Sequence, residues 1–294
     1  MQRVEARPTE PIVSGGPESA MALARGTLPR RALVTGASGG LGAAIAAQLA
    51  RRGCEVWLCA RREQELEARA AEIRARGGRA VTRVLDVSDA AAVLERLPAW
   101  DRECGGFDLV VANAGIGAGR RGTARDFAAE ARVWQVNLIG ASATLSALLE
   151  PMLARGRGTL AAVISLAGRR GMPGSGAYSS SKAALTTYLD ALRCEVEPRG
   201  LRVVELRPGF VHTALSARNE FHMPFAWPVE RAAQTCTDAL LAGRRVRAFP
   251  FPMVLACGVL RALPVWAYTP LSRRLPGARA TPAAARDART EPRA

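Results

Sequence analysis

Lysine is almost absent from this sequence. The 294 residues include 41 lysines and arginines together, and Lys182 is the single lysine among them. We interpret this as a compositional bias that replaces lysine by arginine wherever a positive charge suffices. A guanidinium is a wide planar fork, whereas an ammonium is a compact charge on a flexible stem. The position that keeps lysine is therefore a candidate for a site that needs the compact charge.

Tyrosine is scarce as well, and one of the three tyrosines stands four residues before that lysine. They are Tyr178, Tyr188 and Tyr268. The segment GAYSSSKAAL (176–185) holds Tyr178 and Lys182, a spacing that chance seldom gives. Residues four apart share one face of a helix. We expect the phenol and the ammonium to project together from a helix.

The six cysteines show no Cys-x-x-Cys spacing, and no metal site is expected. The opening residues MQRVEARPTEPIVSGGPESA (1–20) lack the apolar core of a secretory signal. We expect a cytoplasmic protein whose cysteines are reduced and mostly serve packing, at positions 54, 59, 104, 194, 236 and 257.

Acidic residues are too few to balance the basic ones, and the net charge is +15. A nucleic-acid partner is nevertheless not expected, because the arginines are scattered and no run of five like charges occurs. Part of the excess lies in 272–294, with six arginines against one Asp and one Glu. Apolar residues at 49% and charged residues at 23% are ordinary for a soluble globular protein.

Short apolar runs alternate with helical patterns along most of the chain. We expect strands at 31–36, 54–60, 79–87, 107–115, 159–168 and 201–209, and helices at 41–52, 62–78, 88–98, 124–155, 177–197 and 229–243. This alternation predicts an α/β fold, a Rossmann-like doubly wound parallel sheet in a single domain over 30–246. We expect the tails 1–29 and 277–294 to be disordered, and 247–276 to form an apolar C-terminal extension.

A glycine-rich turn, TGASGGLG (35–42), lies between the first strand and the first helix. Its glycines leave room for the backbone to turn and approach a pyrophosphate, and the helix behind them offers N–H groups and its positive dipole end. The position between a strand and a helix supports dinucleotide binding over plain turn chemistry. The expected contact residues are Gly36, Ser38, Gly40, Leu41 and Gly42.

The spacing TGxxxGxG, together with YxxxK, resembles the short-chain dehydrogenase/reductase family over about 30–243. The resemblance implies a strand order of 3-2-1-4-5-6-7 and a nicotinamide dinucleotide cofactor. It also implies a small-molecule carbonyl/alcohol substrate pair and, by analogy with family members, a homo-oligomer.

The residues after the second strand bear on the choice between NADP(H) and NAD(H). An acidic residue there binds the ribose hydroxyls of NAD, but this sequence has Arg61 and Arg62, whose guanidinium groups suit a 2′-phosphate. Family members with this pattern prefer NADP, so NADP(H) is expected over NAD(H). We expect Glu63 to lie inside the next helix already. The alternative is that the two arginines merely begin a solvated helix.

The resemblance assigns further cofactor contacts. Asp86 and the backbone N–H of Val87 meet the adenine, although Asp86 or Ser88 can instead cap the following helix. The segment ANAG, where the family usually has NNAG, places three more residues beside the cofactor, namely Asn113, Ala114 and Gly115. The segment PGFVHT (208–213) matches PGxxxT and adds Pro208, Gly209, Val211 and Thr213, of which the last two touch the nicotinamide carboxamide.

Tyr178 and Lys182 are the centre of the expected catalytic group. A phenol titrates near ~10 unaided, and a nearby ammonium favours the phenolate and lowers that pKa. In the family the lysine also bonds the nicotinamide ribose. The resemblance adds Ser165, which hydrogen-bonds the substrate carbonyl, and Asn137, which holds a water of the proton relay. Taken singly, Asn137 can be a kink residue within a helix and Ser165 a turn residue.

The substrate end of the chain is less informative. Residues 214–230 contain Phe221, Met223, Phe225 and Trp227, which form either an apolar lid or ordinary packing. Neither His212 nor His222 is assigned a role. The apolar run within 244–275 is too short to span a bilayer. It can lie in a membrane interface with its arginines at the headgroups, cover the sheet edge, or pack in a dimer.

We therefore expect an NAD(P)-dependent oxidoreductase that interconverts a carbonyl and an alcohol on a small or lipophilic molecule, with Tyr178 as proton donor or acceptor. The rival is a catalytically silent cofactor-binding sensor on the same fold, or a membrane-surface interaction protein built on 244–275. The intact set of Ser165, Tyr178 and Lys182 argues against a sensor, which needs no proton donor.

Overall fold

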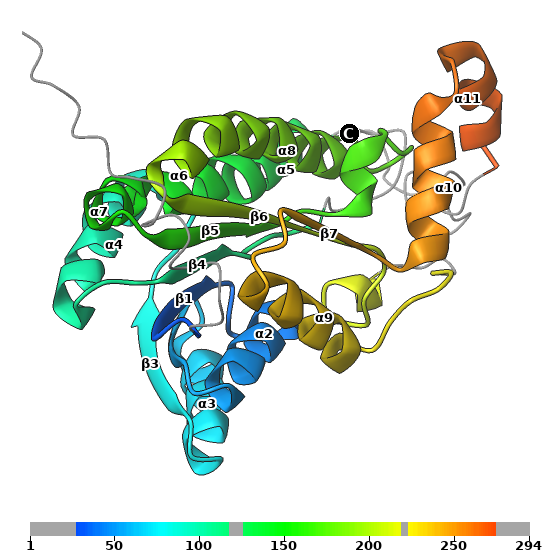
Figure 1. Cartoon of the computed structure of the whole chain (residues 1–294). Coiled ribbons are helices and arrows are strands. Elements are labelled where there is room, and N and C mark those ends of the chain that lie inside the picture. Colours follow the sequence, from blue (N-terminus) through cyan, green and yellow to red (C-terminus); the bar gives the residue numbers. More distant parts are fainter. Residues whose placement is uncertain (1–27, 118–125, 219–222, 275–294) are drawn as a thin grey trace, which may run out of the picture.

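Within the described residues, the sheet is parallel throughout and has seven strands. The computed structural model describes residues 28–117, 126–218 and 223–274. The strand order is β3-β2-β1-β4-β5-β6-β7 (Figure 1), so the predicted doubly wound fold and its strand order are confirmed. The strands are β1 Arg31–Thr35, β2 Glu55–Ala60, β3 Arg79–Val84, β4 Leu109–Ala112, β5 Gly158–Val163, β6 Leu201–Pro208 and β7 Val246–Phe249.

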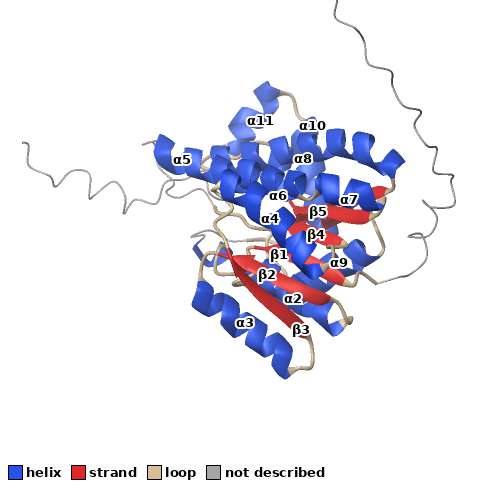
Figure 2. Ribbon diagram, turned by 90° about the vertical axis from the view of Figure 1, so that its left-hand side faces the viewer, coloured by secondary structure: helices blue, strands red, loops and turns tan. Residues whose placement is uncertain are grey.

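Helices cover both faces of the sheet, as Figure 1 and Figure 2 show from two directions. One face carries α2 Gly40–Arg51, α3 Glu63–Ala75 and α9 Val229–Leu241. The other carries α4 Ala90–Cys104, α5 Phe127–Trp134, α6 Ala141–Ala147, α7 Leu149–Arg155 and α8 Gly176–Val196. Beyond β7, α10 Phe251–Ala262 and α11 Val265–Ser272 stand away from the two layers (Figure 1).

Alternate residues of the central strands contribute to two separate cores. Along β1, Ala32 and Val34 pack toward α2 and α9, whereas Leu33 packs toward the helices on the opposite face. A strand buried on both faces needs apolar residues at every position. That requirement explains why the central strands were visible in the sequence as uninterrupted apolar runs.

The strand β7 was not located from the sequence. Its residues VRAF follow two arginines and contain a third, so no apolar run marks them. The strand nevertheless pairs parallel to β6, with Glu205 opposite Val246 and Pro208 opposite Phe249. The domain boundary expected at residue 246 falls at the start of this strand. The tails expected at 1–29 and 277–294 lie almost wholly outside the described residues, and the division into domains stays a prediction.

The helix expected at 124–155 is interrupted. A π-helical turn, η1 Gln135–Gly140, separates α5 from α6, and α7 begins after Leu148. Within the described residues, the run Phe127–Arg155 is long and apolar enough by composition to cross a membrane, yet 56% of its most apolar stretch is buried inside the fold, as in a core helix. The strand expected at 159–168 ends at Val163, and Leu166–Arg169 forms a 3-10 helix, η2.

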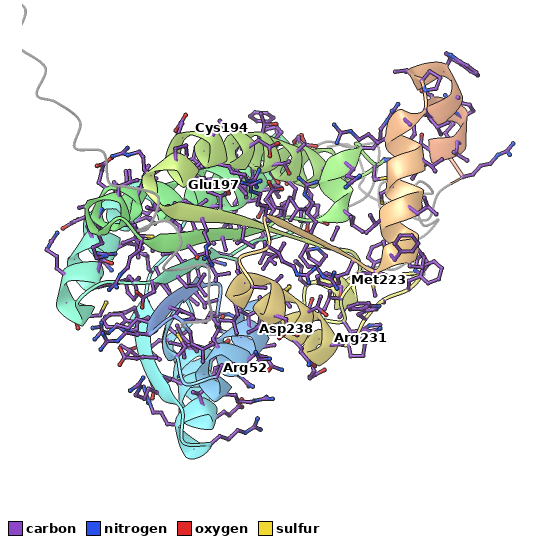
Figure 3. The ribbon with its side chains drawn as sticks, viewed as in Figure 1. Arg52, Cys194, Glu197, Met223, Arg231 and Asp238 are labelled. Atoms are coloured by element: carbon purple, nitrogen blue, oxygen red, sulfur yellow. The ribbon has the colours of Figure 1, made fainter. Side chains whose placement is uncertain are left out.

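Among the ion pairs that join separate elements in the described residues, one is exposed and one is buried. Arg52, the C-cap residue of α2, binds Asp238 of α9 at 2.8 Å, and the two residues lie close together in Figure 3. That pair is exposed and contributes little. Asp101 of α4 is buried, and its carboxylate accepts two hydrogen bonds from Arg155 of α7, at 2.6 and 3.0 Å, and one from the Phe107 backbone at 2.7 Å. This pair fixes the loop that leads into β4.

We predict that Arg155→Met lowers the free energy of unfolding by about 2–3 kcal/mol, because it leaves the buried Asp101 carboxylate with the Phe107 N–H as its one described partner. Arg157→Met is the matched control, since Arg157 lies two residues away and is exposed. Urea denaturation of both variants measures the effect. Equal stability of the two variants contradicts a stabilising role for the buried pair.

Candidate active site

The carboxyl ends of β1 and β4 are joined by hydrogen bonds. The Thr35 hydroxyl accepts from the backbone N–H groups of Asn113 and Ala114, at 3.1 and 3.2 Å. The Asn113 amide in turn donates to the Thr35 and Gly36 carbonyls, at 2.9 and 3.3 Å. The expected ANAG and TGxxxGxG segments therefore form one unit. Sequence reasoning missed Thr35, although this residue directly precedes Gly36 in the glycine-rich turn.

Two of the predicted glycines are required by this junction. Gly36 has φ +68°, and a Cβ there lies 2.7 Å from Ala114 Cα. A Cβ on Gly42 lies 2.3 Å from Asn113 Nδ2, closer than any carbon can approach. The sequence argument attributed these glycines to the approach of a pyrophosphate. In the structure they allow the first helix to pack against the end of β4.

The remaining part of the turn is open. Gly40 has φ +55°, and a Cβ there meets only Thr213, at 3.5 Å. The first residues of α2 have no side-chain cap, since the N-cap position is Gly39. Unpartnered N–H groups at the start of a twelve-residue helix favour an anion. The turn therefore fits a pyrophosphate, with Ser38 and Leu41 beside it.

The guanidinium of Arg62 reaches over this turn. It donates to the Ser38 hydroxyl at 3.2 Å and pairs with Glu65 at 3.0 Å. Arg61 lies 3.5 Å from the carboxylate of Asp86. Glu63 is the first residue of α3, as expected. Both arginines border the space beyond the carboxyl end of β2, and Arg62 also occupies the N-cap position of α3.

Asp86 caps no helix. Its carboxylate accepts from the N–H and the hydroxyl of Ser88, at 2.9 and 2.7 Å. Burial opposes its ionisation, but the hydrogen bonds of Ser88 and the charge of Arg61 keep the pKa of Asp86 below its usual value. The cap of α4 is Asp89, so both capping residues considered in the sequence, Asp86 and Ser88, were wrong.

Val87 is buried against the π-helical turn. A Cβ on Gly140 lies 2.4 Å from the Val87 carbonyl oxygen, so only glycine allows this approach. Sequence reasoning missed Gly140, because a glycine within an expected helix does not indicate which other segment packs against it. The contact sets the position of η1, which contains Asn137.

Tyr178 and Lys182 lie on the first turns of α8, as predicted from their spacing. Lys182 is only 3% exposed, and its Nζ lies 5.9 Å from the centroid of the Tyr178 ring. The ammonium donates to the Val163 carbonyl at the end of β5, at 2.9 Å. Ser165 follows two residues later, and its hydroxyl accepts from the Ala167 N–H at 3.1 Å. The three side chains therefore converge at the carboxyl edge of the sheet.

The ionisation of this group differs from the sequence expectation. Burial raises the pKa of Tyr178 above its usual value, although a hydrogen bond with Ser165 acts in the opposite direction. Burial also lowers the pKa of Lys182, to about 8. The sequence argument expected the ammonium to lower the phenol pKa. Burial has the larger effect, so the direction of the Tyr178 pKa is opposite to the expected one.

Asn137 lies in η1 and is fully buried. Its amide clamps the backbone of Ile116, accepting from the N–H at 2.8 Å and donating to the carbonyl at 2.9 Å. It also donates to the Ser181 hydroxyl at 3.3 Å. A Cβ on Gly115 lies 3.3 Å from Asn137 Oδ1 and 3.6 Å from Lys182 Nζ. Asn137 thus positions the chain beside Lys182, and its part in a water relay stays a prediction.

The PGFVHT segment (208–213) follows β6 and lies at the same carboxyl edge of the sheet, next to the glycine-rich turn. Pro208 ends β6, and the Gly209 N–H donates to the Phe249 carbonyl at 2.7 Å. Val211 is buried and bridges to Trp227. Thr213 faces Gly40 of the glycine-rich turn. This segment therefore lies over the helix N-terminus to which the sequence assigned the pyrophosphate.

The expected apolar lid is only partly described. Phe221 and His222 lie outside the described residues. Trp227 stacks on Phe249 at 5.0 Å and carries Arg231 over its other side at 3.9 Å, so it serves packing. Phe225 is exposed and has φ +56°. In Figure 3, Met223 lies near the foot of α10, and Arg231 lies on α9.

Comparison with known proteins agrees with this geometry. Residues 30–223 match the family model described as short chain dehydrogenase. An uncharacterized oxidoreductase of Myxococcus xanthus is 42% identical over 246 residues, which make up 84% of this chain and 97% of that protein.

Solved structures agree as well. An alcohol dehydrogenase from the archaeon Thermococcus sibiricus, complexed with 5-hydroxy-NADP, is 31% identical, with a TM-score of 0.66 over 75% of this chain and 94% of its own. A short chain dehydrogenase/reductase from Burkholderia phymatum in complex with NAD has a TM-score of 0.71 over 79% of this chain and 92% of its own. At 24% identity it supports the fold alone.

The match over most of the chain and the shared architecture lead to one assignment. The chain belongs to the short-chain dehydrogenase family of oxidoreductases, whose general activity is hydride transfer with NAD or NADP.

Proposed function

We propose that this protein interconverts a carbonyl and an alcohol, with NADP(H) as its preferred cofactor and Tyr178 as the proton donor or acceptor. The observation that carries the proposal is the convergence of Ser165, Tyr178 and Lys182 at the carboxyl edge of the sheet, next to an uncapped helix N-terminus. The bound nicotinamide dinucleotide supplies or accepts the hydride.

The side chains act on the carbonyl oxygen. Ser165 and Tyr178 donate hydrogen bonds to it and polarise the carbonyl. As the oxygen gains negative charge, the Tyr178 hydroxyl transfers its proton to it. The raised pKa of Tyr178 keeps the phenol protonated and ready to donate. With a pKa of about 8, Lys182 is mostly charged at neutral pH, and its ammonium stabilises the phenolate that remains.

The preference for NADP(H) rests on Arg61 and Arg62. Arg62 reaches the Ser38 hydroxyl beside the glycine-rich turn, and Arg61 pairs with Asp86 at a distance of 3.5 Å. In the described residues no acidic side chain occupies the end of β2, where a carboxylate favours NAD. Two guanidinium groups at this end suit the 2′-phosphate.

A cofactor-binding sensor remains the second candidate. It shares the open glycine-rich turn and the arginines, but it has no use for a phenol held between a serine and a buried ammonium. The homo-oligomeric state and the cytoplasmic location stay predictions.

Tyr178→Phe removes the proton donor, so we expect kcat for carbonyl reduction to fall by about 10²–10⁴-fold while NADPH still binds. Tyr188→Phe is the matched control. Tyr188 lies on the same helix, and its hydroxyl pairs with Ser146 at 2.8 Å. A panel of ketones and aldehydes, followed by nicotinamide absorbance, measures turnover. Full activity of Tyr178→Phe contradicts the mechanism, and absence of turnover in the unmodified protein with retained NADPH binding supports the sensor.

Arg62→Ala is expected to weaken NADPH binding by about 10-fold or more and to leave NADH binding nearly unchanged, because charge-assisted hydrogen bonds are worth about 1.5–3 kcal/mol. Arg69→Ala, which removes a half-buried α3 arginine paired with Glu72, is the control. Fluorescence titration with both cofactors gives the dissociation constants. If Arg62→Ala weakens the binding of NADPH and of NADH equally, Arg62 does not recognise the 2′-phosphate.

Lys182→Met tests the burial of the ammonium. The pKa of Lys182 is about 8 in the folded protein against 10.5 for a free lysine, so between these pH values the unfolded chain binds more protons than the folded one. Stability of the unmodified protein therefore rises with pH in this window, by about 3 kcal/mol relative to the variant. Urea denaturation of both proteins across this pH range measures the difference. A pH-independent difference shows that the ammonium is not buried as described.

A further inference from the structure

The helices α10 and α11 expose an unusual amount of apolar surface. No residue of α10 is buried. Phe251, Leu255 and Val259 follow one another at intervals of four, so they share one face, and their exposed fractions are 76%, 60% and 55%. On α11, Val265 and Trp266 are exposed by 71% and 79%. We call residues 250–274, which contain both helices, the hairpin.

The charge of the hairpin has one sign. Its ionised side chains are Arg261, Arg273 and Arg274, all of them exposed, and 246–274 contains no aspartate or glutamate. An apolar face with an exposed tryptophan and arginines at its border is typical of helices that lie in a bilayer interface and bind anionic lipids. At about 1.5 Å per residue, α10 extends about 18 Å and is too short to span the hydrocarbon core.

The hairpin is firmly attached beside the active site. Arg170 donates to the Arg261 and Leu263 carbonyls, at 3.0 and 2.7 Å, and stacks on the Tyr268 ring at 4.2 Å. The Tyr268 hydroxyl donates to the Gly171 carbonyl. These contacts begin five residues after Ser165. At the other end, a Cβ on Gly209 lies 2.7 Å from the Met253 sulfur, so α10 also abuts the PGFVHT segment.

We propose that the hairpin docks on the surface of an anionic lipid bilayer and holds the mouth of the active site against it. A second copy of the chain is the competing occupant. It is disfavoured because a twofold contact through this face brings arginines of both copies together, and 246–274 offers no carboxylate to pair with them. Docking does not depend on the proposed reaction. Only the consequence for the substrate rests on the proposed function, namely that the carbonyl compound is lipophilic and reaches the site from the bilayer.

Flotation of the full-length protein with lipid vesicles tests the docking. Vesicles of phosphatidylcholine with about 30% phosphatidylglycerol are compared with phosphatidylcholine alone. We expect the protein to float with the anionic vesicles, and the fraction that floats with the neutral vesicles to be at least about tenfold smaller. High salt is expected to release the protein from the anionic vesicles. Absence of flotation with anionic vesicles overturns the proposal.

The variant Leu255→Ser/Trp266→Ser removes two exposed apolar side chains. We expect the fraction of this variant that binds the anionic vesicles to be at least about tenfold smaller than that of the unmodified protein. The variant Leu94→Ser/Phe127→Ser is the matched control, because Leu94 and Phe127 are also exposed, by 51% and 69%, and lie outside the hairpin on α4 and α5. Equal flotation of both double variants contradicts the proposal. A second result also contradicts the proposal. If light scattering shows that the unmodified protein is a dimer and that only the hairpin variant is a monomer, a second copy of the chain covers this face.

A water-soluble ketone separates this proposal from the proposed function. If the hairpin variant reduces it at the unmodified rate but no longer floats, docking and chemistry are independent, as we propose. If neither protein turns over any carbonyl compound but the unmodified protein floats, the proposed reaction fails and the docking stands. If the unmodified protein reduces soluble and vesicle-borne ketones with the same efficiency, the inference about a lipophilic substrate fails.

Discussion

The burial of one ammonium beside one phenol is the constraint on which the rest of the site depends. Lys182 is held by the Val163 carbonyl at the end of β5, and its low exposure depresses its pKa. A buried charge costs free energy unless it has partners, and here a single hydrogen bond is described for it. Such an arrangement is expected where the charge is needed for chemistry rather than for stability.

The fold supplies this arrangement through the carboxyl edge of the sheet. The ends of β1 and β4 are locked together by Thr35 and Asn113, and this junction requires glycine at positions 36 and 42. The π-helical turn places Asn137 where it fixes the chain next to Lys182. Glycines that looked like adaptations to a ligand therefore serve first to bring the elements close enough for the site to exist. A π-turn within a helix is common at such sites.

Periodicity and motif spacing predicted most of this, but not all. The central strands were recognised because a strand buried on both faces must be apolar throughout. The helix α8 was recognised from its helical pattern, and the spacing of Tyr178 and Lys182 placed both side chains on one of its faces. The strand β7 was missed, because an edge strand of four residues among arginines has no such signature. The direction of the Tyr178 pKa was also missed. It depends on how much protein surrounds the phenol, which a spacing of four residues does not reveal.

A crystal structure with NADP⁺ bound tests the central claim most directly. The account predicts that the Lys182 ammonium and the Tyr178 hydroxyl both face the nicotinamide ribose within hydrogen-bonding distance, with Ser165 on the same side and the pyrophosphate at the start of α2. A structure in which the two side chains turn away from the nicotinamide ring contradicts the account. It leaves the fold intact and removes the basis for the proposed chemistry.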